Sequence, residues 1–362
     1  MDNIKSIVES QLNTTVTMVV PVGNGNTASC YCVELIDAPY KLVVKTSIHY
    51  ELTCEEKKMN DFLRGKVNFK VPESYFLTEK NGITYLGMEY ITGSSGRSLK
   101  PSQIKDKKHL ANNIIGCFTN MQSVHNEKFG PFDNPTFDTW RNYYWNFFCK
   151  IYEFSSDKYK QGKINKTTMK ALNLIKINFD EIFGNTENVA CLSHGDFWTP
   201  NMIIDTEKSE IAGVIDPFNA RFVEPEYELF CLTLGLGEKL KLYKQYKNRV
   251  QVSQYCDLKV ELYALCNEID WWMKLGEIDT ISYIKMRSKR LIKQIKRNKL
   301  KRTVKPSFCH FIISANCSSL IIVTPKSVAF WSFEPAASPA KTYVVFFETD
   351  EDAFPPKDST IS

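Results

Sequence analysis

The segment that decides the fold spans residues 193–201 and reads Ser-His-Gly-Asp-Phe-Trp-Thr-Pro-Asn, and Ile215-Asp216-Pro217 follows it. Asp196 and Asn201 lie five residues apart in a predicted loop, and Asp216 comes twenty residues after Asp196 at the end of a short apolar run. In phosphoryl transfer from a nucleotide, one carboxylate accepts or orients the proton of the attacking hydroxyl. A second carboxylate and an amide oxygen hold Mg²⁺ against the phosphates. These residue types therefore predict a phosphoryl-transfer site.

Taken singly, each of these residues also fits an ordinary structural role. Aspartate is common in turns because its side chain hydrogen-bonds nearby backbone N–H groups, and Asp216 directly precedes Pro217. The combination favours the catalytic interpretation, because two carboxylates and an amide occur together at this spacing, after a stretch rich in strand-forming residues.

The first ninety residues have the pattern of β-strands with one inserted helix. Runs rich in β-branched and apolar residues predict strands at 15–22, 30–35, 41–45, 71–80 and 83–91. Asn24-Gly25 is typical of a hairpin turn, and residues 53–63 change to helical spacing.

After Gly93-Ser94-Ser95-Gly96 the pattern becomes helical. Helices are predicted at 105–125, 137–153, 165–183 and from Tyr227 to about residue 300, with short apolar runs at 202–204 and 211–215. We therefore predict an α+β fold with a small antiparallel N-terminal lobe (1–91) and a larger, mainly helical C-terminal lobe (92–305). Residues 306–362 are expected to form an appendage whose role the sequence leaves unassigned.

Charge is distributed unevenly along the chain. The net charge is +5, but residues 285–305 carry eleven Lys or Arg and no acid, so the rest of the chain is slightly acidic. Such a segment could bind nucleic acid or an anionic surface in a non-enzymatic binding module. Its cations surround apolar Leu291, Ile292 and Ile295, which favours a solvated helix, so we do not expect a nucleic-acid partner.

The cysteines and apolar segments indicate the compartment. The eleven cysteines contain no CxxC pair, which argues against a structural zinc site and fits free thiols in a reducing cytoplasm. The N-terminus lacks the apolar core of a signal peptide. The most apolar stretch, Phe308 to Phe333, is interrupted by Asn316, Pro325 and Lys326, so we expect no membrane span. A monomer or weak dimer is expected.

The pattern HGDxxxxN followed by IDP resembles the kinase-fold small-molecule phosphotransferases, which include aminoglycoside phosphotransferases, choline kinases and fructosamine kinases. HGDFWTPN is most similar to the fructosamine/ketosamine kinase family, whose loop reads HGDLW-x-x-N. The resemblance covers roughly residues 10–290. Softer matches to that family occur at Phe129-Gly130, Trp140, Phe147-Phe148, 226–229 and 262–272.

The resemblance implies a bilobal, protein-kinase-like fold and the use of ATP and Mg²⁺. It implies that Asp196 is the catalytic base and that Asn201 and Asp216 are the metal ligands. It also implies that His194 and Gly195 shape the loop.

In the N-terminal lobe the resemblance implies a phosphate cover and a lysine. The cover is expected at the turn between the first two strands, formed by Gly23, Asn24, Gly25, Asn26 and Thr27. Lys45 is expected to reach the α- and β-phosphates. Its acidic partner is expected to be Glu55, since Met59 and Phe62 follow it at helical spacing, with Glu56 as a competitor. Main-chain groups of Glu89 and Ile91 are expected to bind the adenine edge.

The acceptor site is the least determined part. Trp198 could stack on a sugar or flat amine, and Asp270 and Trp271 could supply a carboxylate and an aromatic wall for a cationic acceptor. Glu224, Glu226 and Glu228 could attract amines, although a solvated helix start explains them better. The predicted function is phosphorylation of a hydroxyl on a ketosamine or fructosamine-type sugar amine, and an aminoglycoside-type antibiotic phosphotransferase is the alternative.

Overall fold

The computed structural model describes residues 1–25, 27–184, 189–276 and 280–300, and three strands nearer the C-terminus. The chain divides into two compact units, Met1–Leu300 and Lys301–Ser362. The boundary lies a few residues before the predicted end of the helical lobe at residue 305. Asn26 of the predicted phosphate cover lies outside the described residues.

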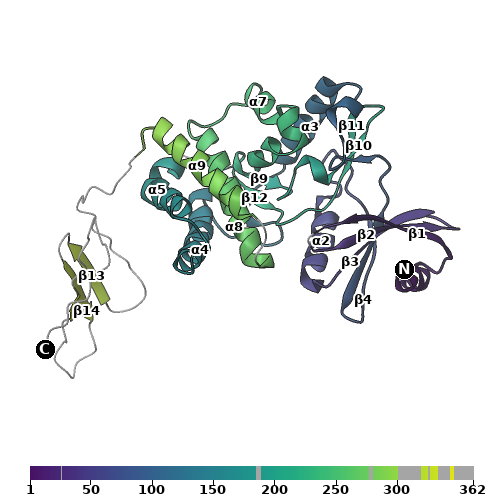
Figure 1. Ribbon diagram of the computed structural model, residues 1–362, viewed down its shortest axis with the longest axis horizontal. Helices are drawn as coiled ribbons and strands as arrows, with labels where there is room; N and C mark the ends of the chain where they lie inside the picture. Colours follow the sequence, from purple (N-terminus) through teal and green to yellow (C-terminus); the bar gives the residue numbers. More distant parts are fainter. Residues whose placement is uncertain are drawn as a thin grey trace. The chain divides into compact units, whose positions relative to one another are not determined.

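The N-terminal lobe is built on a five-stranded antiparallel sheet of order β1-β2-β3-β5-β4. Its strands are β1 (Val16–Asn24), β2 (Ser29–Leu35), β3 (Lys41–Ser47), β4 (Ser74–Lys80) and β5 (Ile83–Glu89). Helix α2 (Tyr50–Leu63) connects β3 to β4, and it lies on the side of the sheet that faces the helical lobe (Figure 1). Every strand predicted in this lobe is present.

Helix α1 (Asp2–Leu12) was not predicted from the sequence. It packs Ile4, Ile7 and Val8 against the sheet, where Val33 and Leu42 of the strands are completely buried. The helix therefore closes the core of the N-terminal lobe. Each such side chain stabilises the lobe by about 1.5–3 kcal/mol relative to an exposed position.

The C-terminal lobe is mainly helical. Its helices are α3 (Lys107–Gln122), α4 (Trp140–Lys160), α5 (Lys166–Phe183), α6 (Leu236–Lys239), α7 (Leu242–Lys247), α8 (Cys256–Leu275) and α9 (Ile281–Arg297). The described residues of this lobe also include three 3₁₀ turns: η1 (Pro101–Gln103), η2 (Thr199–Asn201) and η3 (Tyr227–Thr233). The predicted α+β architecture with a β-rich first lobe and a helical second lobe is confirmed.

An aromatic cluster forms the centre of this lobe. Trp140 stacks on Tyr144 with ring centroids 5.3 Å apart, and its indole N–H donates to the Tyr263 hydroxyl at 3.0 Å. Because all three side chains are buried, the hydrogen bond satisfies two polar atoms that water cannot reach. The cluster therefore fixes α4 against α8.

The helical lobe also contains two small sheets. One has the order β11-β10-β6, with strands Glu210–Val214, Met202–Asp205 and Ser94–Ser95. The other has the order β7-β9-β12-β8, with strands His125–Asn126, Ala190–Ser193, Arg221–Val223 and Gly130–Pro131. Strand β9 precedes the loop that carries Asp196 and Asn201, and β10 follows it. Strand β11 leads to Asp216.

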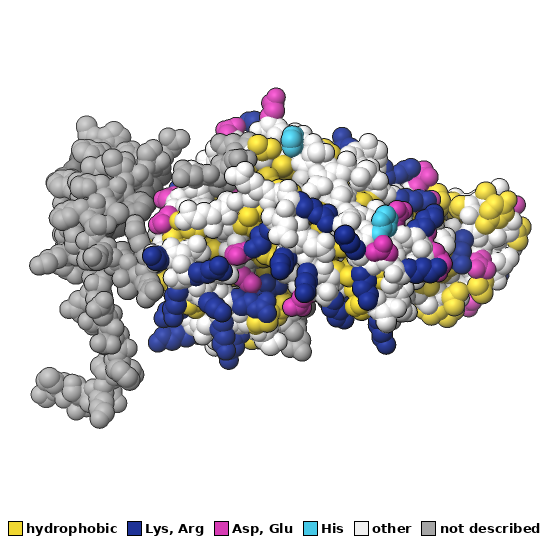
Figure 2. Space-filling model, turned by 90° about the horizontal axis from the view of Figure 1, so that it is seen from above, with side chains coloured by type: hydrophobic (Ala, Val, Ile, Leu, Met, Phe, Trp, Pro, Cys, Tyr) yellow, Lys and Arg dark blue, Asp and Glu magenta, His cyan; other side chains and the backbone are white. Residues whose placement is uncertain are grey.

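The predicted basic segment forms much of α9. The buried side of this helix carries Ile284, Leu291 and Ile295, which belong to the core of the lobe. The exposed side carries lysines and arginines, and Figure 2 shows many such side chains gathered on one face of the first unit. The described part of the segment is therefore an amphipathic helix, while residues 301–305 lie outside the described residues.

In the second unit the described strands are β13 (Ser319–Thr324), β14 (Ser327–Ser332) and β15 (Tyr343–Val345), which pair antiparallel in that order. Two of them fall within the apolar stretch 308–333. None of the helices in the described part of the chain is long and apolar enough to cross a membrane.

A chain truncated after Lys305 should fold and keep the thermal midpoint of the first unit, because residues 1–300 form their own compact unit. Differential scanning calorimetry of the truncated and full-length proteins measures this. A large fall in the midpoint or a loss of solubility would show that residues beyond 305 complete the core.

Candidate active site

The segment between β9 and β10 carries Asp196 and Asn201, and we call it the catalytic loop. It contains a glycine that no other residue can replace. Gly195 has φ +83°, and a Cβ at this position would lie 1.7 Å from the carbonyl oxygen of Phe218. The backbone N–H of Phe218 donates to the His194 carbonyl at 3.2 Å. The residues after Asp216 thus pack directly on the loop that carries Asp196.

His194 is buried at the start of this loop. Burial lowers the pKa of its imidazole to about 4, although the charge of Asp216 opposes the shift. The ring is therefore neutral at physiological pH.

Glu228 also holds this loop, a role that was not predicted from the sequence. Its carboxylate accepts the backbone N–H of His194 at 3.0 Å and of Phe197 at 2.8 Å. Burial raises the pKa of Glu228 to about 8, and the backbone N–H groups oppose that rise. Because it holds backbone atoms on both sides of Asp196, Glu228 is a positioning residue for the loop.

The interpretation of Glu224, Glu226 and Glu228 as a solvated helix start is wrong. All three are buried. The Lys259 ammonium lies 2.8 Å from Glu224 and 3.1 Å from Glu226. These glutamates are therefore tied into the core and do not attract amines from solvent. The sequence signal that could have identified this pairing is Lys259 itself, a lysine on the otherwise apolar side of α8.

Asp196 and Asn201 are directly bonded. The Asn201 Nδ2 donates to Asp196 Oδ2 at 2.7 Å and to the Asp196 carbonyl at 3.1 Å. Burial and the charge of Asp216 raise the pKa of Asp196 to about 7, while the side chains of Asn201 and Trp198 oppose this rise. A carboxylate with a raised pKa is a better proton acceptor than an ordinary aspartate, so the environment suits a general base.

The β10–β11 hairpin brings Asp216 to this pair. Met202 lies opposite Val214, and the Ile215 N–H donates to the Asn201 carbonyl at 2.9 Å. Asp216 itself has φ +62°, a left-handed conformation that few non-glycine residues adopt and that is common at functional sites.

Lys45 of β3 joins the two lobes. Its ammonium lies 2.7 Å from Glu56 Oε2 and 2.7 Å from Asp216 Oδ1, and only 8% of the residue is exposed. Burial alone would lower the pKa of Lys45, but the two carboxylates outweigh it and raise the pKa. In turn Lys45 outweighs the burial of Asp216 and lowers the pKa of that carboxyl. Lys45 and Asp216 are therefore both charged.

The prediction that Glu55 pairs with Lys45 is wrong, because Glu56 holds that position. Glu55 is exposed, whereas Glu56 is 6% exposed. The buried face of α2 follows Glu56, Asn60 and Leu63 at helical spacing. This buried face was missed in the sequence because Asn60, in its middle, is polar. Met59 and Phe62 indicated instead a buried face that begins at Glu55.

The predicted phosphate cover is the β1–β2 turn. The Gly25 N–H donates to the Ala28 carbonyl at 2.8 Å, and the Ser47 hydroxyl of β3 donates to the Thr27 carbonyl at 2.8 Å. A Cβ at Gly23 would meet no atom within 4 Å, so the space beside this strand end is open. The side chain of Asn24 lies outside the described residues.

The segment predicted to bind adenine has its side chains engaged elsewhere. The Glu89 carboxylate lies 2.5 Å from the Lys70 ammonium, and the Glu89 N–H donates to the Glu73 carbonyl at 2.8 Å. Ile91 is buried, and its side chain packs where a Cβ on Gly213 would lie. For Glu89 this leaves the carbonyl as the group that could reach a base.

Of the three residues predicted to bind the acceptor, the two tryptophans are partly exposed and the aspartate is buried. Trp198 is partly buried beside Asp196, and Trp271 stacks on Phe218 with ring centroids 4.1 Å apart. Asp270 is 7% exposed and its Oδ2 accepts from Lys274 Nζ at 2.8 Å. The Asp270 carboxylate is therefore not presented to a cationic acceptor, contrary to the prediction.

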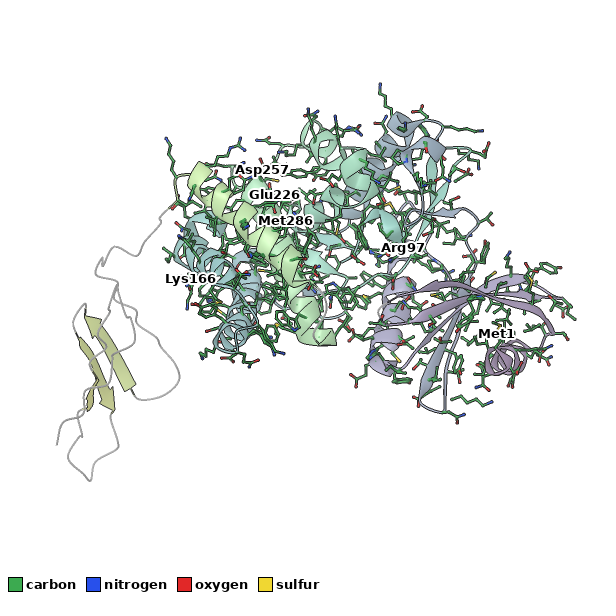
Figure 3. The ribbon with its side chains drawn as sticks, in the orientation of Figure 1. Met1, Arg97, Lys166, Glu226, Asp257 and Met286 are labelled. Atoms are coloured by element: carbon green, nitrogen blue, oxygen red, sulfur yellow. The ribbon has the colours of Figure 1, made fainter. Side chains whose placement is uncertain are left out.

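Arg97 is a site residue that sequence reasoning missed. It is exposed, and its charge acts on the pKa values of both Asp196 and Asp216. Figure 3 shows it on the side of the helical lobe that faces the N-terminal lobe. Its neighbour Gly96 fixes the backbone, because the Gly96 N–H donates to Met202 and a Cβ there would lie 2.1 Å from the Thr199 carbonyl. A lone arginine in a Gly/Ser-rich stretch gave little warning.

Residues 25–248 match the sequence profile of the phosphotransferase enzyme family (APH). The chain belongs to the phosphotransferase enzyme family. No curated protein matches its sequence. The predicted resemblance to kinase-fold small-molecule phosphotransferases is thereby confirmed, and this phosphotransferase is a small-molecule kinase.

Solved structures share the fold of this phosphotransferase at low sequence identity. A protein from Thermobifida fusca YX-ER1 assigned as a fructosamine-3-kinase is 17% identical, with a TM-score of 0.61 over 81% of this chain and 99% of that one. A thermostable mutant of an aminoglycoside phosphotransferase, solved with ADP and hygromycin B, is 16% identical, with a TM-score of 0.62 over 81% and 98%. A Haemophilus somnus 129PT protein also assigned as a fructosamine-3-kinase is 12% identical, with a TM-score of 0.60 over 80% and 96%.

The donor set of the phosphotransferase fits Mg²⁺. This ion binds few protein groups, keeps several waters and prefers carboxylate, amide and phosphate oxygens. Asp216 supplies a charged carboxylate, and Asn201 directs its amide nitrogen toward Asp196 and so its amide oxygen the other way. Groups of three or more His, Cys, Asp or Glu side chains suited to a metal are absent from the described residues, so nucleotide phosphates would have to complete the coordination.

The Asp196 carboxyl of the ligand-free enzyme should titrate near pH 7. Carbon-13 NMR of labelled aspartate carboxyls measures this, with the resonance assigned by its loss in Asp196→Asn. Because the Asp216 charge contributes to the raised pKa, Asp216→Asn should lower it. Titration near pH 4, where an ordinary aspartate titrates, would contradict the proposed environment of Asp196.

Proposed function

We propose that the protein is an ATP- and Mg²⁺-dependent kinase that transfers the γ-phosphoryl group to a hydroxyl of a ketosamine or fructosamine-type sugar amine. The observation that carries the proposal is a pair of contacts: Asn201 hydrogen-bonds Asp196, and Lys45 of the N-terminal lobe bonds Asp216, whose charge acts on Asp196. Each element supplies one requirement of phosphoryl transfer, which is mainly positioning and charge stabilisation.

Asp196 is proposed as the base that accepts the proton of the acceptor hydroxyl. Its raised pKa matches it to that proton near neutral pH. Asn201 holds Oδ2 of this carboxylate, so the other oxygen is left to face the hydroxyl. Glu228 keeps the loop in place while the proton moves, since it bonds the backbone and does not touch the acceptor.

Lys45 and Asp216 are proposed to hold the phosphates. In the ligand-free protein they pair with each other, so the cation is already placed beside the carboxylate that would bind Mg²⁺. When bound, the Mg²⁺ ion would neutralise charge on the β- and γ-phosphates. Arg97 is exposed and its charge acts on both Asp196 and Asp216, so it is a second cation available to the phosphates.

Aminoglycoside phosphorylation is the second candidate, because an aminoglycoside phosphotransferase with hygromycin B bound shares the fold. The nature of the acceptor wall favours the first candidate. Asp270, the carboxylate expected to bind a cationic acceptor, is buried and paired with Lys274. A polycation would therefore meet an ammonium group where it needs a carboxylate.

A panel of fructose ketosamines and aminoglycosides, incubated with ATP and Mg²⁺ and followed by ADP release and by mass spectrometry of the product, tests the proposal. Turnover of a ketosamine is expected. Asp196→Asn should lower kcat by about 10²–10⁴-fold, the usual contribution of a general base, while leaving the KM for ATP nearly unchanged.

Asp133→Asn is the matched control, since Asp133 is exposed and lies outside the site. It should leave turnover unchanged. Turnover confined to aminoglycosides would overturn the proposed acceptor, and full activity of Asp196→Asn would overturn the proposed mechanism.

A further inference from the structure

An aromatic pair lies directly against the catalytic loop. The Phe218 carbonyl occupies the space where Gly195 would carry a Cβ, so Phe218 contacts the residue before Asp196. Trp271 of α8 stacks on the Phe218 ring, with 17° between the ring planes. Both rings are partly exposed. Their exposed parts offer a flat or sugar-like group a stacking surface next to the loop that carries Asp196.

Lys274 lies one helical turn beyond Trp271 on α8 and completes this surface. Its ammonium donates to Asn219 Oδ1 at 2.8 Å and to Asp270 Oδ2 at 2.8 Å, and it lies 5.4 Å from the centroid of the Phe218 ring. These contacts fix the direction of a side chain that is otherwise flexible. About a third of the Lys274 side chain is exposed (35%), so the ammonium can also contact a ligand.

The charges around Lys274 leave it as the cation that faces an acceptor. Asp270 is buried and paired with Lys274, and its charge also acts on the buried Arg221. Arg221 is held below the surface by the Tyr143 hydroxyl and the Asn219 carbonyl. Glu55 of α2 also acts on Lys274, but the two form no ion pair within the described contacts.

We propose that Phe218, Trp271 and Lys274 form the acceptor subsite, and that this subsite selects an acceptor carrying an anionic group next to its sugar ring. The inference rests on the proposed function and names the substrate class within it. The ring stacks on the aromatic pair, and a carboxylate on the amine portion pairs with the Lys274 ammonium. A polycationic acceptor would be repelled by the same ammonium.

Two acceptors that differ in one charge test the inference: the fructose ketosamine of glycine, which carries a carboxylate, and that of glycinamide, which does not. The wild-type enzyme should prefer the first by about tenfold in kcat/KM, the size expected for one charge-assisted hydrogen bond at a partly exposed site. Lys274→Met should remove this preference by raising the KM of the glycine ketosamine, with kcat and the KM for ATP unchanged.

Two further variants separate recognition from structure. Lys274→Arg keeps the charge and should restore most of the preference. Lys289→Met, which removes an exposed lysine of α9, should leave both acceptors unaffected. If Lys274 served only to support Asn219 and Asp270, Lys274→Met would lower kcat for both acceptors alike.

Equal kcat/KM values for the two acceptors in the wild-type enzyme, or an equal effect of Lys274→Met on both, would overturn this inference and leave the proposed kinase function standing. If neither ketosamine is phosphorylated while another acceptor shows Asp196-dependent turnover, the proposed function fails in its acceptor class. The two failures are therefore distinguishable.

Discussion

The structure depends on one buried ammonium group, that of Lys45, which bonds a carboxylate from each lobe. Glu56 holds it within the N-terminal lobe, and Asp216 reaches it from the end of the β10–β11 hairpin. Between Lys45 and Glu56, whose side chains are both buried, removing one partner costs about 3–5 kcal/mol, because the remaining charge has lost its water. Lys45, proposed to bind phosphate, and Asp216, proposed to bind the metal, are therefore held together in the ligand-free protein.

In the helical lobe, buried glutamates hold the backbone and side chains around Asp196 through hydrogen bonds and ion pairs. Glu228 accepts backbone N–H groups on both sides of Asp196, and Lys259 neutralises Glu224 and Glu226. An unpaired buried carboxylate would be costly, so each of these groups restricts the geometry around it. The aromatic cluster of α4 and α8 extends to Tyr227, the residue before Glu228, whose ring lies 5.2 Å from that of Trp140.

The sequence predicted the elements of the fold well because strand and helix periodicity are local signals, and the HGD motif identified the loop and its Asn201. It failed where the answer depended on tertiary contact. The burial of Glu56 over Glu55 depends on how α2 meets the sheet. The pairing of Asp270 with Lys274 is different, because it is an i,i+4 pair within α8 and therefore a local signal that the prediction did not use. Arg97 and Glu228 carry no local signal, since only packing brings them to Asp196.

The most direct test of the central claim, that Lys45, Asn201 and Asp216 form one nucleotide–metal site, is isothermal titration calorimetry of ADP with and without Mg²⁺. The wild-type protein is predicted to bind ADP at least about tenfold more tightly when Mg²⁺ is present, a gain of about 1.4 kcal/mol or more. Asp216→Ala is predicted to bind ADP with no such gain. An Asp216→Ala protein with an unchanged Mg²⁺ dependence would contradict the account.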